Sequence, residues 1–310
     1  MGESKRAVVI GANGFIGSHL VDRLSAAGHE VTAFDRFSSG SASFNSDVHR
    51  IKGDFLNSDD LRQAVEGQQL LFHFLSTSTP ATAERDPSFD VRTNVLQSIE
   101  LMKLAAEAGV EHVYFASTGG AIYGDNGYDV CGENDPTFPV SPYAIGKLTI
   151  ENYLRYFEAR LGLASTTFRI SNPFGTRQHI DRKQGLVPIV LRQVALGNPV
   201  LQLGDGSMVR DYVYVEDLAE MITTVVDRGG SEDLYNLGSG EGRSVASVLQ
   251  TIREITGSDF EVRVEPKPPT YVDRVTLDTS RYVEEFGAPM LTDFAEGVRM
   301  TWREVLSQCQ

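Results

Sequence analysis

One pair of side chains in this sequence has the types and the spacing needed for acid–base chemistry. Tyr143 and Lys147 are four residues apart, so in a helix they share one face. A phenol with its ordinary pKa of about 10 is a poor base at neutral pH. An ammonium group one turn away and a positively charged cofactor ring both favour the phenolate. We therefore predict a phenolate that takes the proton of a carbinol while hydride leaves the same carbon.

Two hydroxyl side chains, Ser117 and Thr118, follow a run of residues 112–116 (HVYFA) that is typical of a strand. In open parallel sheets, ligands bind at the carboxyl ends of the strands, where a hydroxyl can hydrogen-bond the reacting oxygen. The alternative is a hydroxyl that only caps the strand end. Counting from the strand selects Thr118 as the catalytic hydroxyl, and the choice between it and Ser117 stays open.

A glycine-rich loop follows the first apolar run. Gly11, Gly14 and Gly17 have the spacing G-x-x-G-x-x-G, which lets a backbone turn sharply and approach a pyrophosphate at a helix N-terminus. Phe15 and Ile16 provide backbone N–H groups in that first turn. The alternative is a plain strand-to-helix turn.

An acidic residue, Asp35, ends the second predicted strand 24 residues after Gly11. A carboxylate there accepts hydrogen bonds from the adenosine ribose and repels a 2′-phosphate, which favours NAD over NADP. Arg36 keeps NADP open, because an arginine can hold that phosphate. Asp54 follows the third strand, where it can either meet the adenine amino group or serve as a helix N-cap or turn residue.

The elements that position these residues alternate between strands and helices. We predict strands at 7–10, 30–34, 48–52, 70–75, 112–116 and 164–170, and helices at 14–27, 59–66, 88–108 and 141–161. Such alternation with continuous apolar strands indicates an α/β fold, a Rossmann-type doubly wound parallel sheet.

The pattern changes after about residue 170, where proline and glycine become denser and helices shorten. We predict a smaller α/β substrate-binding portion there. The domains are then an NAD-binding domain over 1–168 and a mainly substrate-binding domain over 169–310. Residues 211–228 return to strand-then-helix patterning, and we expect them to rejoin the first domain.

Composition limits the possible partners and the location. The formal charge of −14 disfavours nucleic acid and acidic lipid. No apolar run approaches membrane-helix length and the N-terminus lacks a signal-peptide pattern, so we expect a cytoplasmic protein. Cys131 and Cys309 form no metal-ligand spacing, and we expect no metal.

In this order and at these distances, the motifs resemble the extended short-chain dehydrogenase/reductase family, specifically nucleotide-sugar epimerases of the UDP-glucose 4-epimerase kind. The resemblance spans about residues 6–300. Further matching stretches are Tyr123-Gly124, Ser141-Pro-Tyr143, 169–175 (RISNPFG), 204–206 (GDG) and 209–213 (VRDYV).

The resemblance implies functions for individual residues. Cofactor contacts are expected at Gly11, Asn13, Gly14, Phe15, Ile16, Gly17, Asp35, Arg36, Ser39, Gly40, Asp54, Phe55, Leu75, Ser76, Thr77, Asn94, Ser117, Tyr143 and Lys147. Substrate contacts are expected at Thr118, Tyr143, Asn172, Gly185, Leu186, Leu201, Leu203 and Arg210.

Arg210 also has an independent physical case, because a guanidinium binds phosphate oxygens through two hydrogen bonds. Its alternative is a salt bridge with Asp211 or Asp217. The chain departs from the family at 268–271 (PPTY), where charged phosphate and ribose contacts are usual. Arg274 or Lys267 are the candidates to replace them.

The resemblance implies NAD as cofactor and a UDP-sugar as the favoured substrate, inverted at C4 through a 4-keto sugar. A 4,6-dehydratase needs an acid–base pair after the threonine, where this chain has Gly119-Gly120. A keto-sugar reductase and, in a different class, a non-enzymatic NAD-binding regulator stay open. A homodimer is expected, because related enzymes pair through the helices at 88–108 and 141–161.

Overall fold

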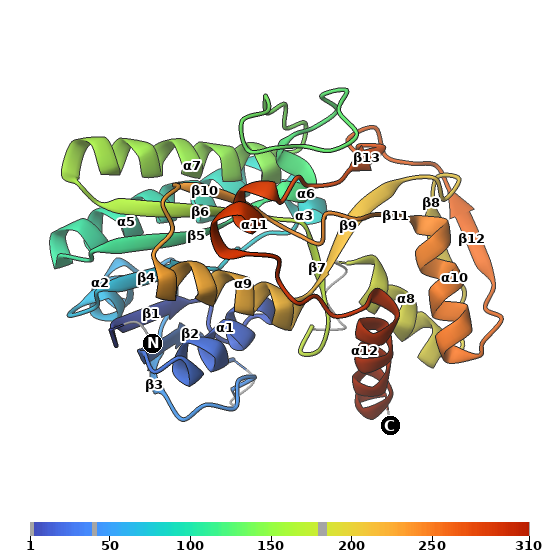
Figure 1. The fold of residues 1–310 in the computed structure, drawn as a ribbon, viewed down its shortest axis with the longest axis horizontal. Coiled ribbons are helices and arrows are strands. Elements are labelled where there is room, and N and C mark those ends of the chain that lie inside the picture. The colour runs from blue at the N-terminus through green and yellow to red at the C-terminus, as the bar shows by residue number, and fades with distance from the viewer. Residues whose placement is uncertain (1–2, 39–41, 179–184, 310) are drawn as a thin grey trace. The chain divides into compact units, whose positions relative to one another are not determined.

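The computed structural model describes residues 3–38, 42–178 and 185–309, and these residues form two compact units (Figure 1). Unit 1 comprises Met1–Thr118, Pro139–Arg169 and Ala219–Tyr235, and unit 2 comprises Gly119–Phe138, Ile170–Leu218 and Asn236–Gln310. Ala219–Tyr235 is thus part of unit 1, and Gly119–Phe138 is part of unit 2. The chain therefore passes between the units several times.

A seven-stranded parallel sheet forms the centre of unit 1, in the order β10-β6-β5-β4-β1-β2-β3. β1 pairs in parallel with both β2 and β4, which is the doubly wound arrangement predicted from the alternating pattern. Its strands are β1 (Arg6–Ile10), β2 (Glu30–Asp35), β3 (His49–Lys52), β4 (Leu70–His73), β5 (His112–Thr118), β6 (Ala164–Ile170) and β10 (Leu234–Leu237).

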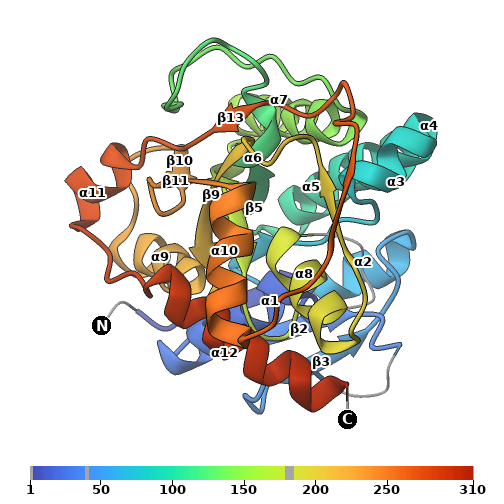
Figure 2. The same cartoon turned by 90° about the vertical axis from the view of Figure 1, so that its right-hand side faces the viewer.

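Helices cover both faces of this sheet. α2 (Ser58–Val65), α5 (Leu96–Ala108) and α7 (Pro142–Leu161) lie on one face, and α1 (Phe15–Ala26) lies on the other with the later part of α9 (Val215–Arg228) (Figures 1 and 2). The apolar side chains between α2, α5, α7 and the strands form one buried cluster. Burial on both faces explains why the strands are continuously apolar.

The catalytic helix candidate, α7, has clear sequence signals at both ends. The Ser141 hydroxyl accepts a hydrogen bond from the Ala144 N–H, and Pro142 occupies the first turn. At the other end Gly162 takes a left-handed conformation with φ of 71°, which glycine adopts without strain. These caps fix where the helix begins, and hence where Tyr143 and Lys147 lie on it.

The predicted helix at 88–108 is instead a composite. Two short helices, α3 (Pro80–Arg85) and α4 (Pro87–Asp90), precede a π-helical turn, η1 (Val91–Val95), that runs into α5. In this turn the Leu96 N–H donates to the Val91 carbonyl, five residues back. Single π turns of this kind are frequent at functional sites.

Unit 2 is built around β9 (Val209–Tyr214). β11 and β13 flank β9 in one sheet, and β7 also pairs with it, while β8 and β12 form a separate two-stranded sheet. α8, α10 and α12 pack together over an apolar core (Figure 2). The remaining elements are α6 (Gly119–Ile122), β7 (Asn172–Phe174), α8 (Leu186–Ala195), β8 (Val200–Leu203), β11 (Gly242–Ser244), α10 (Val245–Thr256), β12 (Val262–Glu265), β13 (Arg274–Val275), α11 (Ser280–Phe286) and α12 (Phe294–Gln308).

Among the described residues, no helix has both the length and the apolar character needed to cross a bilayer.

Candidate active site

The glycine loop after β1 is closed tightly on itself. Gly11 has a φ of +89°, a conformation that side chains rarely permit, and a Cβ on Gly17 would lie 2.1 Å from the Gly11 carbonyl oxygen. Gly14 is the N-cap of α1. Within the described chain, no side chain caps this helix and its first turn carries no acid. The backbone N–H groups of Phe15 and Ile16 lie in the first turn of α1. This N-terminus of the helix therefore suits an anion.

Asp35 is held beside this loop by the backbone. Its Oδ2 accepts a hydrogen bond from the Asn13 N–H at 3.1 Å, and its Oδ1 accepts one from the Arg36 N–H at 2.7 Å. The Arg36 side chain is exposed. The bare helix end and the adjacent carboxylate fit the pyrophosphate and ribose of a dinucleotide. Ser39 and Gly40, also predicted as cofactor contacts, lie outside the described residues.

Asp54 and Phe55 differ in their surroundings. Asp54 is exposed, and its Oδ1 accepts a hydrogen bond from the Leu56 N–H at 3.0 Å, as a turn residue does. Phe55 is buried, with its ring centroid 5.4 Å from that of His73. Phe55 therefore contributes to the core of unit 1.

The segment after β4 borders the glycine loop. A Cβ on Gly11 would lie 3.0 Å from the Leu75 backbone, so the two segments are in close contact. The Thr77 N–H donates to Asn94 Oδ1 at 2.9 Å, and the Ser76 hydroxyl donates to the Ser78 carbonyl. Asn94 itself is buried in the π-helical turn. Leu75 therefore borders the glycine loop, and Thr77 is tied directly to Asn94.

The structure brings Tyr143 and Lys147 to the end of β5. Lys147 Nζ donates a hydrogen bond to the Ala116 carbonyl at 2.7 Å. The same nitrogen lies 4.7 Å from the Phe115 ring centroid and 5.8 Å from the Tyr143 ring centroid. The lysine thus links α7 to β5, the strand that ends in Ser117 and Thr118.

The hydroxyl of Ser117 is engaged inside the protein. It donates to Glu151 Oε1 at 2.5 Å, and Glu151 forms an ion pair with Arg169 at 2.9 Å. Ser117 is buried, whereas Thr118 is partly exposed at the end of β5. Thr118 is therefore the better placed of the two to meet a substrate oxygen.

The surroundings of Tyr143 raise its pKa. Burial and then the Asp90 carboxylate raise the pKa of Tyr143 to about 12, whereas the sequence predicts that Lys147 and a positively charged cofactor ring together favour the phenolate. Burial also lowers the pKa of Lys147 to about 8, and Asp90 and Glu151 act against that fall. The protein alone therefore keeps the phenol protonated, because burial disfavours its charged form.

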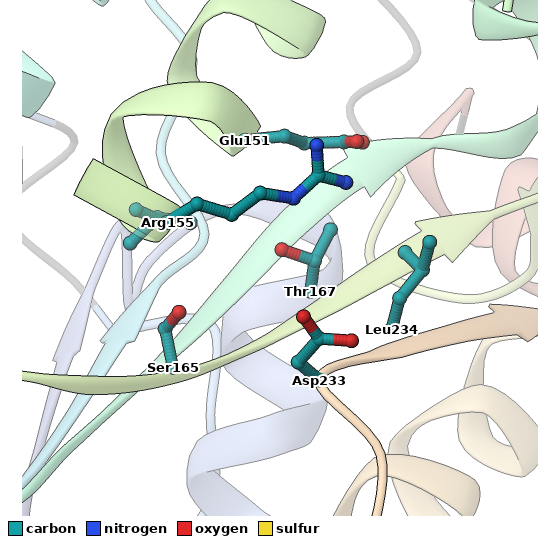
Figure 3. A pocket seen from close by; sticks show the side chains of 7 residues that line it. Glu151, Arg155, Ser165, Thr167, Asp233 and Leu234 are labelled. Atoms are coloured by element: carbon teal, nitrogen blue, oxygen red, sulfur yellow. The ribbon is translucent and has the colours of Figure 1, made fainter. Parts of the chain in front are cut away.

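A small pocket in unit 1 is lined in part by Glu151 and Arg155 of α7. Arg155 extends from α7 so that its guanidinium lies between Glu151 and Thr167, and Asp233 lies just before β10 (Figure 3). Its volume of about 10 Å³ suits about one water molecule. This pocket is too small for a dinucleotide or a sugar.

In unit 2, Asn172 and Arg210 have their side chains held by backbone carbonyls. Asn172 Nδ2 donates to the Asp211 carbonyl at 3.1 Å. Arg210 donates to the carbonyls of Val209 at 2.7 Å and Val272 at 2.6 Å. The carboxylate of Asp211 instead accepts hydrogen bonds from Ser239 and Gly240.

Asp217, the other acid considered as a partner of Arg210, accepts hydrogen bonds from Thr292. Both substitutes proposed for the missing family cations are themselves paired. Arg274 lies 3.3 Å from Asp129, and Lys267 is paired with Asp273. Arg210 is therefore the better candidate for an anion contact in unit 2.

The other predicted substrate contacts are spread over two elements of unit 2. Gly185 is the N-cap of α8 and Leu186 is its first residue. Leu201 and Leu203 lie in β8, where Leu201 is exposed and Leu203 is partly buried.

Two buried carboxylates near the candidate catalytic residues were not predicted. Glu151 lies four residues after Lys147, and Asp90 lies four residues before Asn94. Both spacings place the side chains on the face of a predicted helix that already carries a site residue. A spacing of four residues from a predicted site residue is the sequence signal that could have identified these two carboxylates.

A doubly wound parallel sheet with a glycine loop after its first strand is typical of dinucleotide-binding proteins of the Rossmann class. Residues 7–238 match the NAD dependent epimerase/dehydratase family, and the chain belongs to that family.

Several relatives resemble the chain over nearly its whole length. A UDP-glucose 4-epimerase of Mycolicibacterium smegmatis is 33% identical, covering 96% of this chain and 97% of the relative. A UDP-glucose 4-epimerase from Thermotoga maritima, solved with UDP-glucose, superposes with a TM-score of 0.92 at 31% identity, covering 98% of this chain and 100% of the relative. The Thermus thermophilus enzyme, solved with NAD, gives 0.89 at 32% identity, covering 97% and 98%.

The reaction varies among similar proteins. A dTDP-4-dehydro-6-deoxyglucose reductase of Escherichia coli is 28% identical over 93% of each chain. Family membership therefore establishes the fold and the class of enzyme, and leaves the reaction to the residues of the site.

Proposed function

We propose that this protein is an NAD-dependent epimerase that inverts C4 of a UDP-sugar through a transient 4-keto sugar. The observation that carries the proposal is the set of groups at the end of β5. Tyr143 and Lys147 serve a single carbinol, and the two residues that follow Thr118 are glycines. Inversion at C4 needs no second proton-transfer group, and this arrangement offers none at positions 119 and 120.

The cofactor would lie against the glycine loop of unit 1. Gly11, Gly14 and Gly17 would accommodate the pyrophosphate at the N-terminus of α1, and Asp35 would accept the ribose hydroxyls. When bound, NAD supplies a hydride acceptor and a positively charged ring. The Asp35 carboxylate favours NAD over NADP, because it would repel a 2′-phosphate.

The chain's own residues would move one proton. Tyr143 would take the C4 hydroxyl proton and later return it, while Thr118 would hydrogen-bond the same oxygen. Lys147, anchored on the Ala116 carbonyl, would place a positive charge beside the phenol. A charge of this kind offsets part of the burial cost that keeps the pKa of Tyr143 high.

In unit 2, Arg210 and Asn172 would bind the nucleotide diphosphate, and Gly185, Leu186, Leu201 and Leu203 would contact the base and ribose. A side chain at position 120 would have its Cβ 3.3 Å from Asn172 Nδ2. Glycine at this position therefore leaves room beside the amide.

A second candidate is a keto-sugar reductase, which the similarity to the Escherichia coli reductase favours. It would consume a reduced cofactor with each turnover, whereas an epimerase regenerates its cofactor. Dehydration, a third possible reaction, would need a side chain that moves a proton at C5 or C6.

The distinguishing experiment is turnover of a UDP-sugar in deuterated water, followed by NMR of the product. We expect inversion at C4 with no deuterium on carbon and no net consumption of cofactor. Deuterium at C3, C5 or C6, or stoichiometric oxidation of a reduced cofactor, would reject the C4-epimerase. Tyr143→Phe is the control and should slow turnover by on the order of 10²-fold or more.

A further inference from the structure

A buried carboxylate outside the predicted site, Asp90, ends the short helix α4. It is 2% exposed. Its Oδ1 accepts hydrogen bonds from the Ser78 hydroxyl and from Asn94 Nδ2, the latter at 2.9 Å. Asn94 in turn accepts from the Thr77 N–H through its own Oδ1. Asp90 is therefore held firmly by the same residues that shape the segment next to the glycine loop.

The other oxygen of Asp90 faces the catalytic helix. A Cβ built on Gly146 would lie 2.7 Å from Asp90 Oδ2, which is closer than real Cβ contacts. Gly146 stands between Tyr143 and Lys147 in α7. The absence of a side chain at this one position is what allows the carboxylate to approach the helix backbone.

Two elements, α7 and β4, provide the charged and titratable groups near this contact. α7 provides Tyr143, Lys147 and Glu151, and β4 provides His73, whose pKa burial and Lys147 lower to about 3. His73 is therefore neutral across the working range of pH. Glu151 is already paired with Arg169.

The effect of Asp90 on both catalytic groups has the same sign. A negative charge opposes formation of the phenolate, so it raises the pKa of Tyr143. It also stabilises the ammonium, so it opposes the lowering of the Lys147 pKa by burial. Removing the charge should lower both pKa values.

We propose that Asp90 is a positioning residue that fixes the charge state of the Tyr143–Lys147 pair through its contact with Gly146. It keeps Lys147 charged in a buried place, and it holds the proton on Tyr143 until a positively charged cofactor ring opposes it. This inference rests on the proposed function for its kinetic test, but it also predicts a property of the phenol that does not depend on turnover.

The first experiment compares Asp90→Asn with the parent enzyme. Asparagine keeps the size and can still accept the bonds from Ser78 and Asn94, so the charge is the main change. We expect both limbs of the profile of kcat against pH to move to lower pH by about one pH unit. The matched control is Asp86→Asn, an exposed acid in the same segment, which should leave the limbs in place.

The second experiment titrates Tyr143 directly in the protein with NAD added. Tyrosine labelled with ¹³C at Cζ is followed by NMR, and Tyr143→Phe assigns the resonance. Tyr143 should ionise at lower pH in Asp90→Asn than in the parent. If the parent shows no C4 inversion, the proposed function fails while this titration still tests Asp90.

A third variant covers the case in which Asp90→Asn does not fold. Gly146→Ala retains the charge but displaces it from α7, so Tyr143 should again ionise at lower pH, with a smaller change. Reduced kcat at every pH with unmoved limbs and an unchanged Tyr143 titration would overturn the proposal. Asp90 would then be only a buried acceptor for Ser78 and Asn94.

Discussion

Arg169 in unit 1 is held by a carboxylate, whereas Arg210 in unit 2 is held by backbone carbonyls. The Arg169 and Glu151 side chains are 3% and 2% exposed and neutralise each other. Arg210 donates to the carbonyls of Val209, Val272 and Asp273, which fix its position without cancelling its formal charge. The first arrangement suits an internal support, and the second suits recognition of an anion.

The largest effect should come from breaking the internal pair. Glu151→Gln leaves a buried guanidinium without its counter-charge, and we expect the free energy of unfolding to fall by about 3–5 kcal/mol. Urea denaturation measures this change. Glu261→Gln is the control, because its pair with Arg263 is exposed at 63% and 67% and should contribute less than about 1 kcal/mol. Equal losses in the two variants would contradict the distinction.

A smaller effect is expected at Arg210. Arg210→Met removes the charge, and we expect KM for a UDP-sugar to rise by about 10- to 100-fold, as for loss of a charged hydrogen bond. The value of kcat should change much less. Arg210→Lys keeps the charge but lacks the planar guanidinium. Its KM should therefore lie between that of the parent and that of Arg210→Met. An unchanged KM with a large loss of stability would make Arg210 a structural residue like Arg169.

Substitutions on the outer side of α7 should have the smallest effect on catalysis. Its inner side carries the charged Lys147 and Glu151, while Ile145, Tyr153 and Tyr156 on α7 are 50%, 39% and 55% exposed. Exposed apolar side chains on one helix mark a contact surface, and we expect a homodimer. Light scattering should show a dimer for the parent and a monomer for Tyr156→Glu. Tyr128→Glu, an equally exposed change in unit 2, should remain dimeric, and a monomeric parent would contradict the expectation.

The sequence was informative wherever local pattern decides structure. The predicted strand at 164–170 and the helix ending at Gly162 agree with the structure, because apolar runs and a left-handed glycine are local signals. β5 extends to Thr118 rather than to residue 116, so both strand-end hydroxyls belong to the strand itself. The ends of helices and strands are the features that the local sequence determines least.

The properties of the site that could not be predicted from the sequence depend on burial. The pKa of Tyr143 depends on how deeply the phenol is buried and on neighbours such as Asp90, which is 53 residues away in the chain. The link between Ser117 and Glu151 similarly joins residues 34 apart. Spacing within a helix predicted which side chains share a face, but not which charges lie opposite that face.

The π-helical turn at Val91–Val95 connects α4 to α5. It determines how far α4 is rotated about the helix axis relative to α5. A π turn accommodates an extra residue relative to an α-helix, and each residue of an α-helix rotates the next by about 100°. Loss of one residue from this turn would leave α5 packed in the core and swing α4 around its axis. Asp90 would then leave Gly146, so the length of this turn, as much as the identity of the acid, keeps a negative charge against α7.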